Sequence, residues 1–256
     1  MLSAVRQSKI QEQLKSKSFI TTRALSDSLG VDVSTIRRDL VALEKSGLLT
    51  RTHGGAVLVD GGSLADVPYK IKVSAHLAEK AAIGRAAAAF VSPGATVVVD
   101  SGSTTFHLIS ALRDSVSKLT VVTNDLRIAH TCADTKGWNL LVTGGHLIEN
   151  VYTLAGERAV DFMDGVRADY AFLGADAVDM RAGVTNSDPQ EARLKQSMIK
   201  ASNKVFLLAD SSKFGHRSVN YVSDLNAFST IVTDTKVEIP ARASYPDSLV
   251  LVEPDR

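Results

Sequence analysis

The stretch that decides the fold of the N-terminal part is residues 31–40, VDVSTIRRDL. Asp32 is suited to cap a helix start, because its side-chain oxygen can accept hydrogen bonds from free backbone N–H groups there. Ile36, Leu40 and Leu43 follow at positions i, i+4 and i+7, which makes one apolar stripe on a helix. The residues between them are polar. The stretch therefore predicts a helix with one buried side and one polar side.

Two shorter helices are predicted before this stretch. Ile10 and Leu14 lie four residues apart in a polar segment, as on one side of a helix. Thr21 can cap a second helix that runs to Leu29. Gly30 then offers the positive φ that a tight turn needs. Two helices joined by a tight glycine turn are typical of a helix-turn-helix motif.

The polar side of the third helix points to nucleic acid. In helix-turn-helix proteins the N-terminal part of this helix enters the major groove. Arginine binds guanine there, and serine or threonine contacts bases or phosphates. A solvated surface helix with two arginines remains open on the residues alone. Asp39 is expected to orient Arg37 or Arg38, or to face solvent, because a carboxylate repels phosphate.

A hairpin is predicted directly after this helix. Residues 47–59, GLLTRTHGGAVLV, hold two β-prone runs around a His-Gly-Gly tip. A hairpin in this place is a wing whose tip can contact phosphate or the minor groove. For His53 alone, a polar turn residue remains the alternative. The expected DNA-binding residues are Thr22, Arg23, Ser34, Thr35, Arg37, Arg38, Arg51, Thr52, His53 and Gly54.

Composition agrees with a basic module on a larger body. The chain has 256 residues, 45% hydrophobic and 22% charged, which allows packed cores. Through Gly55 there are nine basic and five acidic residues, a net charge of +4. The remainder has 20 basic and 23 acidic residues, a net charge of −3. A basic segment on a slightly acidic body fits one module that faces phosphates, although a solvated basic helix has the same charge.

Cysteine content and hydropathy exclude several classes. Cys132 is the single cysteine, so intramolecular disulfides and cysteine-rich zinc sites are excluded, and neither a metal nor a cofactor is expected. No apolar run approaches the roughly 18 to 20 residues of a membrane helix. The first 17 residues are polar, so no signal peptide is expected. We expect a cytoplasmic protein without a membrane partner.

The rest of the chain alternates between strand-like and helix-like segments, which predicts the α/β class. Residues 1–59 are expected to form the winged helix-turn-helix domain, 60–73 a linker, and 74–256 a ligand-binding domain. The strand-like runs are mostly apolar throughout, as in a mainly parallel sheet covered by helices on both faces. Strands are predicted at 96–100, 119–123, 139–143, 168–174, 204–210, 230–233 and 248–252, and helices at 74–91, 104–112, 125–133 and 189–202.

Polar loops follow several of these strands. In parallel sheets the ligand lies outside the carboxyl ends of the strands. The loop 100–105, DSGSTT, enters a helix, and hydroxyls with backbone N–H groups at a helix start can bind a phosphate. An ordinary capping cluster is the alternative for this loop in isolation. The expected ligand-binding residues are Asp100, Ser101, Gly102, Ser103, Thr104, Thr105, Asn124, Gly144, Gly145, Gly174, Asp176, Glu191, Lys195 and Lys213.

Glu191 and Lys195 allow a second interpretation. They lie at i and i+4 on a predicted helix, which is the favoured order for a surface ion pair. That interpretation stays open on spacing alone.

These motifs resemble the DeoR family of bacterial regulators. The run 31–40 followed by 51–56, RTHGGA, is similar to the family's DNA-binding domain. The segments 100–105, 120–124, 169–176, 191–201 and 208–215 are similar to its effector domain, which itself resembles ribose-5-phosphate isomerase. The resemblance implies a repressor of a carbohydrate-metabolism operon that binds double-stranded operator DNA and a phosphorylated sugar or polyol. A homo-oligomer, a dimer or tetramer, is expected because one chain has one helix-turn-helix and such proteins usually bind paired half-sites.

By the same resemblance, the loop from Ser101 to Thr105 would hold the phosphate, and Asp176, Glu191, Lys195 and Lys213 would line the pocket. The alternative is a sugar-phosphate isomerase with a fused DNA-binding module, which needs a carboxylate to move a proton. Such isomerases carry a second acid directly after their Gly-Ala-Asp, and here Ala177 follows Asp176. We therefore expect a regulator and no enzyme.

Overall fold

The computed structural model divides into two compact units, Met1–Ala75 and His76–Arg256. The expected linker lies almost entirely outside the described residues, as does His53. The structure describes residues 3–16, 19–45, 49–52, 54–58, 72–73, 75–148, 151–237 and 249–254.

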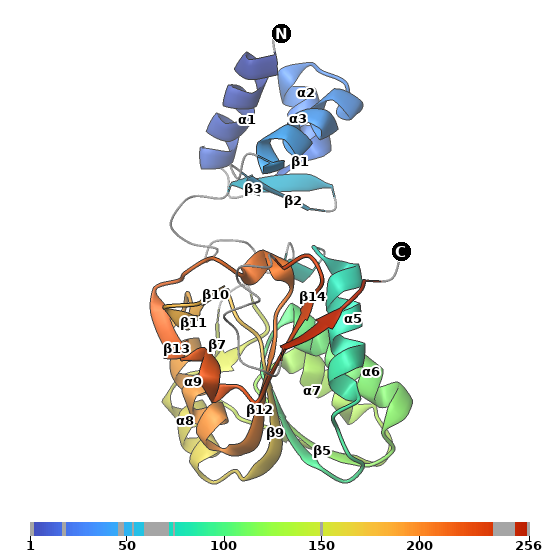
Figure 1. Ribbon diagram of the computed structural model, residues 1–256, viewed down its shortest axis with the longest axis vertical. Coiled ribbons are helices and arrows are strands. Elements are labelled where there is room, and N and C mark those ends of the chain that lie inside the picture. Colours follow the sequence, from blue (N-terminus) through green and yellow to red (C-terminus); the bar gives the residue numbers. More distant parts are fainter. Residues whose placement is uncertain are drawn as a thin grey trace. The chain divides into compact units, whose positions relative to one another are not determined.

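The first unit packs three helices on a small antiparallel sheet (Figure 1). Its sheet has the strand order β1-β3-β2, with Ile20 opposite Ala56 and Arg51 opposite Ala56 on the other side. The predicted wing hairpin is thus confirmed, and a two-residue strand extends it. The elements are α1 (Ser3–Ser16), β1 (Ile20–Thr21), α2 (Thr22–Leu29), α3 (Val33–Lys45), β2 (Leu49–Thr52) and β3 (Gly55–Leu58).

The predicted apolar stripes form the core of this unit. Side chains from all three helices and the sheet are buried together, and Leu29 is partly buried beside them. Thr21 caps α2 by accepting a hydrogen bond from the Ala24 N–H at 3.0 Å, and Gly30 has φ +62°. Asp32 accepts from the Ser34 N–H at 2.7 Å at the start of α3. The helix-turn-helix prediction is confirmed by these contacts. The buried residues are Ile10, Leu14, Ile20, Leu25, Ile36, Leu40, Leu43, Leu49 and Ala56.

The second unit is built on a seven-stranded parallel sheet with the order β15-β14-β12-β9-β4-β5-β6 (Figure 1). All six of its strand pairings are parallel. Each predicted strand is present, with its ends within two residues of the expected ones. The strands are β4 (Thr96–Val99), β5 (Leu119–Thr123), β6 (Trp138–Val142), β9 (Ala168–Leu173), β12 (Ser202–Leu208), β14 (Thr230–Asp234) and β15 (Leu249–Val252).

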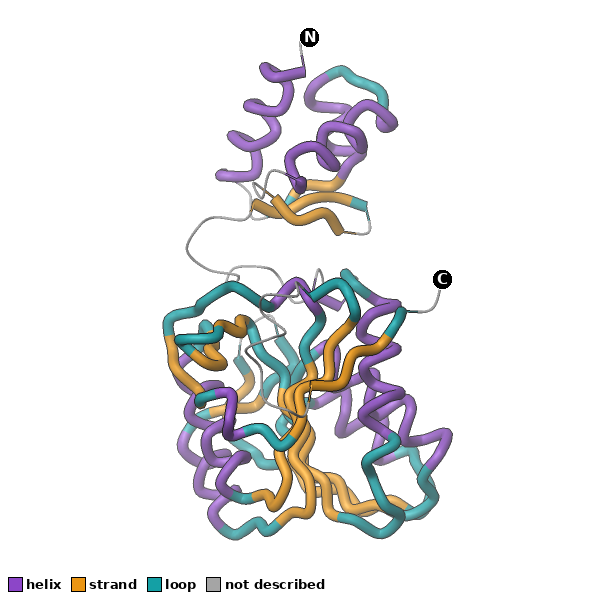
Figure 2. The backbone as a smooth tube through the Cα atoms, viewed as in Figure 1, coloured by secondary structure: helices purple, strands orange, loops and turns teal. Residues whose placement is uncertain are grey.

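Helices cover both faces of this sheet, which explains its continuous apolar strands (Figure 2). Val97 and Val99 face one buried cluster, and Val98 faces the other. The helices α5 (Leu77–Ala88), α6 (Ser103–Ser115) and α7 (Leu126–Ala133) lie on one side, and α8 (Glu157–Asp164) and α9 (Pro189–Lys200) lie on the other (Figure 1). Helix α8 is absent from the sequence prediction.

Two small antiparallel sheets join the main one near its carboxyl edge. The strands β10 (Ala177–Asp179), β11 (Gly183–Asn186) and β13 (Asn220–Ser223) form one of them. The hairpin β7 (His146–Leu147) and β8 (Leu154–Ala155) forms the other. A bridge between Asp125 and Thr153 ties the hairpin segment to the residues after β5. The sequence prediction assigned no strand to these segments.

Candidate DNA-binding surface and effector site

The start of α3 presents the predicted polar residues to solvent. Ser34, Arg37 and Arg38 are exposed, and Thr35 is partly exposed. Arg23 on α2 is exposed as well, whereas Thr22 is only 8% exposed. The backbone N–H of Thr22 donates to the carbonyl of Gly54, at 2.6 Å, so this pair joins the start of α2 to the wing.

Asp39 corrects one expectation, because it turns away from Arg37 and Arg38. It lies three residues after Ile36 on the buried side of α3 and forms an ion pair with Arg6 of α1. Ser3 and Gln7 also donate to its Oδ1, at 3.1 and 3.3 Å. Burial alone would raise the pKa of Asp39, but these donors hold it below its ordinary value. Asp39 therefore fastens α1 to the helix that carries the polar surface.

The wing is fastened to α3 near its C-terminal end. The backbone N–H of Arg51 donates to Glu44 Oε1 at 2.9 Å, and its guanidinium Nε contacts Glu44 Oε2 at 2.7 Å. Arg51 was expected at the tip as a phosphate contact, and the structure places it beside Glu44 with 42% of its side chain exposed. Of the remaining wing residues, Gly54 has φ +100° in the turn, while nothing is described of His53 or of the Thr52 side chain.

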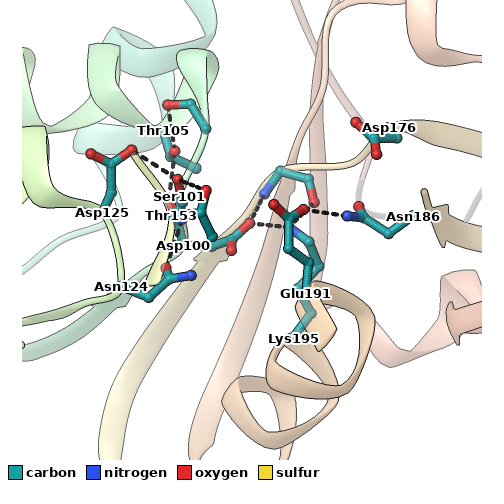
Figure 3. Close-up of polar contacts among 12 residues, drawn as sticks. Asp100, Ser101, Thr105, Asn124, Asp125, Thr153, Asp176, Asn186, Glu191 and Lys195 are labelled. Carbon is teal, nitrogen blue, oxygen red and sulfur yellow. Dashed lines mark hydrogen bonds and ion pairs between the residues drawn. The ribbon is translucent and has the colours of Figure 1, made fainter. Parts of the chain in front are cut away.

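The effector-site residues converge around Asp100, at the carboxyl end of β4 (Figure 3). Asp100 forms a buried ion pair with Lys195 of α9. The N–H of Gly174, after β9, donates to Asp100 Oδ2 at 3.0 Å, and Lys195 Nζ donates to the Gly174 carbonyl at 3.1 Å. Three segments far apart in the sequence thus meet at one point. Since Lys195 is only 3% exposed, it does not belong to an ion pair at the solvated surface.

Burial affects the two partners of this ion pair differently, and it raises the pKa of Asp100 above its ordinary value although Lys195 lowers it. Burial alone would lower the pKa of Lys195, but the negative charges of Asp100 and Glu191 raise it above its ordinary value. The ammonium group is therefore charged at neutral pH and held inside the protein. A buried ion pair of this kind depends on both partners, because either charge left alone is costly.

Ser101 begins a second set of contacts on the other side of Asp100 (Figure 3). Its backbone N–H donates to Asn124 Oδ1 at 2.8 Å. Its hydroxyl donates to Asp125 Oδ2 at 2.9 Å and lies 2.7 Å from the hydroxyl of Thr153. Asn124 Nδ2 in turn donates to the Leu154 carbonyl at 3.2 Å. The loop is thus attached to the end of β5 and to the β7–β8 hairpin.

Some residues of the loop that is expected to bind phosphate are buried, and others are partly exposed. Thr105 is buried and donates to the carbonyls of Asp100 and Gly102, at 2.7 and 3.0 Å. Thr104 is also buried. Gly102 and Ser103 are partly exposed at the start of α6, where no side chain caps the helix. Thr105 therefore shapes the loop, and the N–H groups of the first turn of α6 can receive an anion.

Acceptor oxygens gather at the start of α9. Asp176 accepts from the N–H and the hydroxyl of Ser187, at 3.0 and 2.5 Å. Glu191 accepts from Asn186 Nδ2 at 2.5 Å. Figure 3 shows Asp176, Asn186 and Glu191 on the α9 side of the site, opposite Ser101. Carboxylates in these positions can accept hydrogen bonds from the hydroxyl groups of a sugar or polyol.

Three expected residues stand apart from these contacts. Gly144 and Gly145 have φ values of +70° and +107° and lead into β7, where a Cβ on Gly145 would collide with the Ala155 carbonyl. Lys213 ends a short helix after β12, and its N–H donates to the Asp210 carbonyl at 3.0 Å. Among the described residues, no hydrogen bond or ion pair joins Lys213 to the loop after β4.

Several residues of the site are missing from the expected ligand-binding residues. Asp125, Thr153, Asn186 and Ser187 make the contacts above, and Arg127 forms an ion pair with Asp125. Asp125 follows a strand directly, so its position was the signal that could have found it. Thr153 has no such signal, because a hairpin brings it to the loop.

The described residues include no group of three or more His, Cys, Asp or Glu side chains that could hold a metal ion. No helix within them is long and apolar enough to span a membrane.

A winged helix-turn-helix with an exposed basic helix start and a separate α/β unit with a polar strand edge define a class: DNA-binding regulators with a sensor domain. Residues 6–61 match the DeoR-like helix-turn-helix domain, and residues 75–235 match the DeoR C terminal sensor domain. The chain therefore belongs to the DeoR family of transcriptional regulators. The resemblance drawn from residues 31–40 and 51–56 is confirmed.

The chain is similar to regulators over nearly its whole length. It is 34% identical to the transcriptional regulator GlpR of Haloferax volcanii, covering 98% of each chain. It is 33% identical to the transcriptional repressor AccR of Agrobacterium fabrum, over 90% of this chain and 89% of that one. It is 29% identical to the glycerol-3-phosphate regulon repressor of Escherichia coli K12, covering 99% of each.

Solved structures show weaker similarity. Ribose 5-phosphate isomerase A from Methanocaldococcus jannaschii has a TM-score of 0.40 and 16% identity, over 53% of each chain. The eIF2B delta protein of Chaetomium thermophilum has a TM-score of 0.46 and 17% identity, over 61% of this chain and 55% of that one.

Proposed function

We propose that this regulator represses a carbohydrate-metabolism operon and that a phosphorylated sugar or polyol controls its binding to double-stranded operator DNA. The observation that carries the effector class is the partly exposed loop at Ser101–Ser103, at the uncapped start of α6. A helix start with free N–H groups favours a phosphate. The name of the glycerol-3-phosphate regulon repressor, a relative over the full length, supports the same class.

The contacts support a division of roles within the site. The first turn of α6 and Ser103 would hold the phosphate, while Asp176 and Glu191 would accept hydrogen bonds from ligand hydroxyls. Lys195 would act without touching the ligand, because its ion pair neutralises Asp100 and holds the loop that follows Asp100 in place. Lys213 would come to the ligand from the loop after β12 as a point charge.

The same contacts favour sensing over catalysis. A sugar-phosphate isomerase needs a carboxylate that takes and returns a proton. Here Ala177 follows Asp176, Glu191 accepts a hydrogen bond from Asn186, and the Lys195 ammonium is bound to Asp100 inside the protein. We therefore propose that the ligand is bound unchanged.

The proposal includes a homo-oligomer in the cytoplasm. One chain has one helix-turn-helix, and such proteins usually bind paired half-sites as dimers or larger oligomers. A repressor works where the chromosome is, which in a bacterium is the cytoplasm. Sedimentation equilibrium of the full chain would give the oligomer size.

A thermal-shift screen tests the effector class. The full chain is heated with a panel of phosphorylated sugars and polyols and with their unphosphorylated parents. A bound ligand raises the melting temperature by mass action. We expect a phosphorylated compound to raise it and its parent to have no effect. A panel in which only unphosphorylated compounds act would overturn the effector class and leave the DNA-binding role standing.

A further inference from the structure

Two carboxylates flank the loop that is proposed to hold the phosphate. Asp100 precedes Ser101, and Asp125 accepts a hydrogen bond from the Ser101 hydroxyl at 2.9 Å. Unneutralised carboxylates beside a phosphate would repel it, because like charges at short range in a partly buried site interact strongly. Lys195 neutralises Asp100. The charge of Asp125 needs a cation of its own.

Arg127 is that cation. Its Nη2 contacts Asp125 Oδ2 at 2.7 Å, and its guanidinium lies over the rings of Phe106 and Tyr152, at 5.2 and 5.1 Å from their centroids. Its side chain is 19% exposed, against 0% for Asp125. Two aromatic faces and one carboxylate therefore hold the guanidinium in place.

Asp125 is ionised in this arrangement. Its Oδ1 accepts from the N–H groups of Arg127 and Ile128, at 2.7 and 3.1 Å. Its Oδ2 accepts from Arg127 and from the Ser101 hydroxyl. A carboxyl group that accepts at both oxygens is in its acceptor-only, charged form. Burial raises the pKa of Asp125 above its ordinary value, and the N–H groups of Ile128 and Arg127 and the Ser101 hydroxyl offset only part of that rise.

The ionised state of Asp125 determines which way the hydroxyl groups of Ser101 and Thr153 donate. Ser101 has one proton and gives it to Asp125, so Thr153 must donate to Ser101 across their 2.7 Å contact. Neither hydroxyl then offers a proton to a phosphate. On this side the anion meets a carboxylate and two committed hydroxyls, and its binding depends on how fully the carboxylate is neutralised.

We infer that Arg127 makes this loop compatible with an anionic ligand by neutralising Asp125, and that it acts as a positioning residue without touching the ligand. The inference rests on the proposed phosphate site. Burial lowers the pKa of the Arg127 guanidinium to about 10, which leaves it charged at neutral pH. Tyr152 and Phe106 keep it at Asp125 and away from solvent.

The test is titration calorimetry of the full chain with inorganic phosphate at constant ionic strength. We expect Arg127→Met to weaken phosphate binding by roughly tenfold, and Arg127→Lys to weaken it less. The double variant Asp125→Asn/Arg127→Met should recover most of the loss, because asparagine still caps α7 but carries no charge. Arg113→Met, at an exposed arginine on the last turn of α6, is the matched control and should bind as the wild type does.

The double variant separates charge from packing. If Arg127 only filled space between Phe106 and Tyr152, removal of the Asp125 charge would recover nothing, and that result would overturn the inference. Asp125→Asn alone gives a second measurement should Arg127→Met unfold, and it should bind phosphate at least as tightly as the wild type. Weaker binding by that single variant also contradicts the inference.

The outcomes distinguish this inference from the proposed function. Wild-type chain that binds no phosphate overturns the phosphate site and this inference with it. Wild-type binding that Arg127→Met leaves unchanged overturns the role of Arg127 alone.

Discussion

Lys195 carries its charge inside the protein, where the carboxylate of Asp100 and the carbonyl of Gly174 surround it. Its place explains how residues from β4, β9 and α9 stay together at the carboxyl edge of the sheet. The i, i+4 spacing to Glu191 could not reveal this, because the same spacing occurs in surface pairs. Burial of Lys195 depends on which face of α9 packs on the sheet.

Replacing Lys195 tests that account. Lys195→Met leaves Asp100 buried without its cation, and we expect a loss of about 3–5 kcal/mol in the free energy of unfolding. Lys200→Met, at an exposed lysine on the same helix, should change it by less than about 0.5 kcal/mol. Urea unfolding of the full chain measures both. Equal stability of the two variants would contradict the buried pair.

Asp39 gives a pH-dependent prediction. The donors on its carboxylate hold its pKa below the unfolded value, so its contribution is present above the unfolded pKa and is lost as the pH falls through the folded pKa. The stability difference between wild type and Asp39→Asn should therefore be largest near neutral pH and shrink below about pH 4. Thermal unfolding followed by circular dichroism at several pH values measures it. A difference that grows toward low pH would refute the role of Asp39.

At the scale of elements, α3 is held at its middle and near its C-terminal end. Asp39 attaches it to α1, and Glu44 attaches it to the wing through Arg51. The exposed residues Ser34, Arg37 and Arg38 lie before these contacts, in the N-terminal half of the helix. A rigid helix presents its side chains to a groove without first losing conformational freedom.

Arg38→Ala tests this surface. If Arg38 contacts a phosphate, affinity for operator DNA and the slope of its salt dependence should both fall; if it contacts a base, specificity should relax at one position. A gel-shift titration at three salt concentrations distinguishes the two. Arg113→Ala, on the sensor unit, should leave binding unchanged. An unaltered Arg38→Ala titration would exclude that residue from the interface.

The elements also show what a sequence pattern can reveal. The central strands were predictable because both their faces are buried, so β4 ends in three buried valines. The edge strands β6 and β15 are only partly buried, and their apolar residues alone marked them. Strand β1 has two residues and no period to detect. Helix α8 begins after Gly156 without a side-chain cap, so its start carries no signal. The partners of Ser101 come from β5 and from a hairpin, and only the topology brings them together.

At the scale of the whole molecule, the chain has two compact units. A ligand bound by one unit can control DNA binding by the other only if the two binding equilibria are coupled. A ligand changes DNA affinity only by the difference between its affinities for the DNA-bound and free forms. Linkage then requires that operator DNA change ligand affinity by the same factor.

This reciprocity can be measured once the thermal-shift screen supplies a ligand. We expect the factor by which the ligand changes the operator Kd to equal the factor by which operator DNA changes the ligand Kd, with values of about 5- to 150-fold typical of such coupling. Fluorescence anisotropy with labelled operator and calorimetry with the ligand give the two factors. If the ligand changed the operator Kd while operator DNA left the ligand Kd unchanged, the ligand would not be acting on the DNA-binding equilibrium.

The buried place of Lys195 has a consequence for covalent labelling. Amine-directed acylating reagents attack the neutral form of an accessible lysine, and Lys195 is neither neutral nor accessible. Such a reagent should modify the exposed Lys200 and leave Lys195 intact as long as the sensor unit is folded. In peptide mass spectra of the labelled protein, the appearance of a modified Lys195 would then report that α9 has left the sheet.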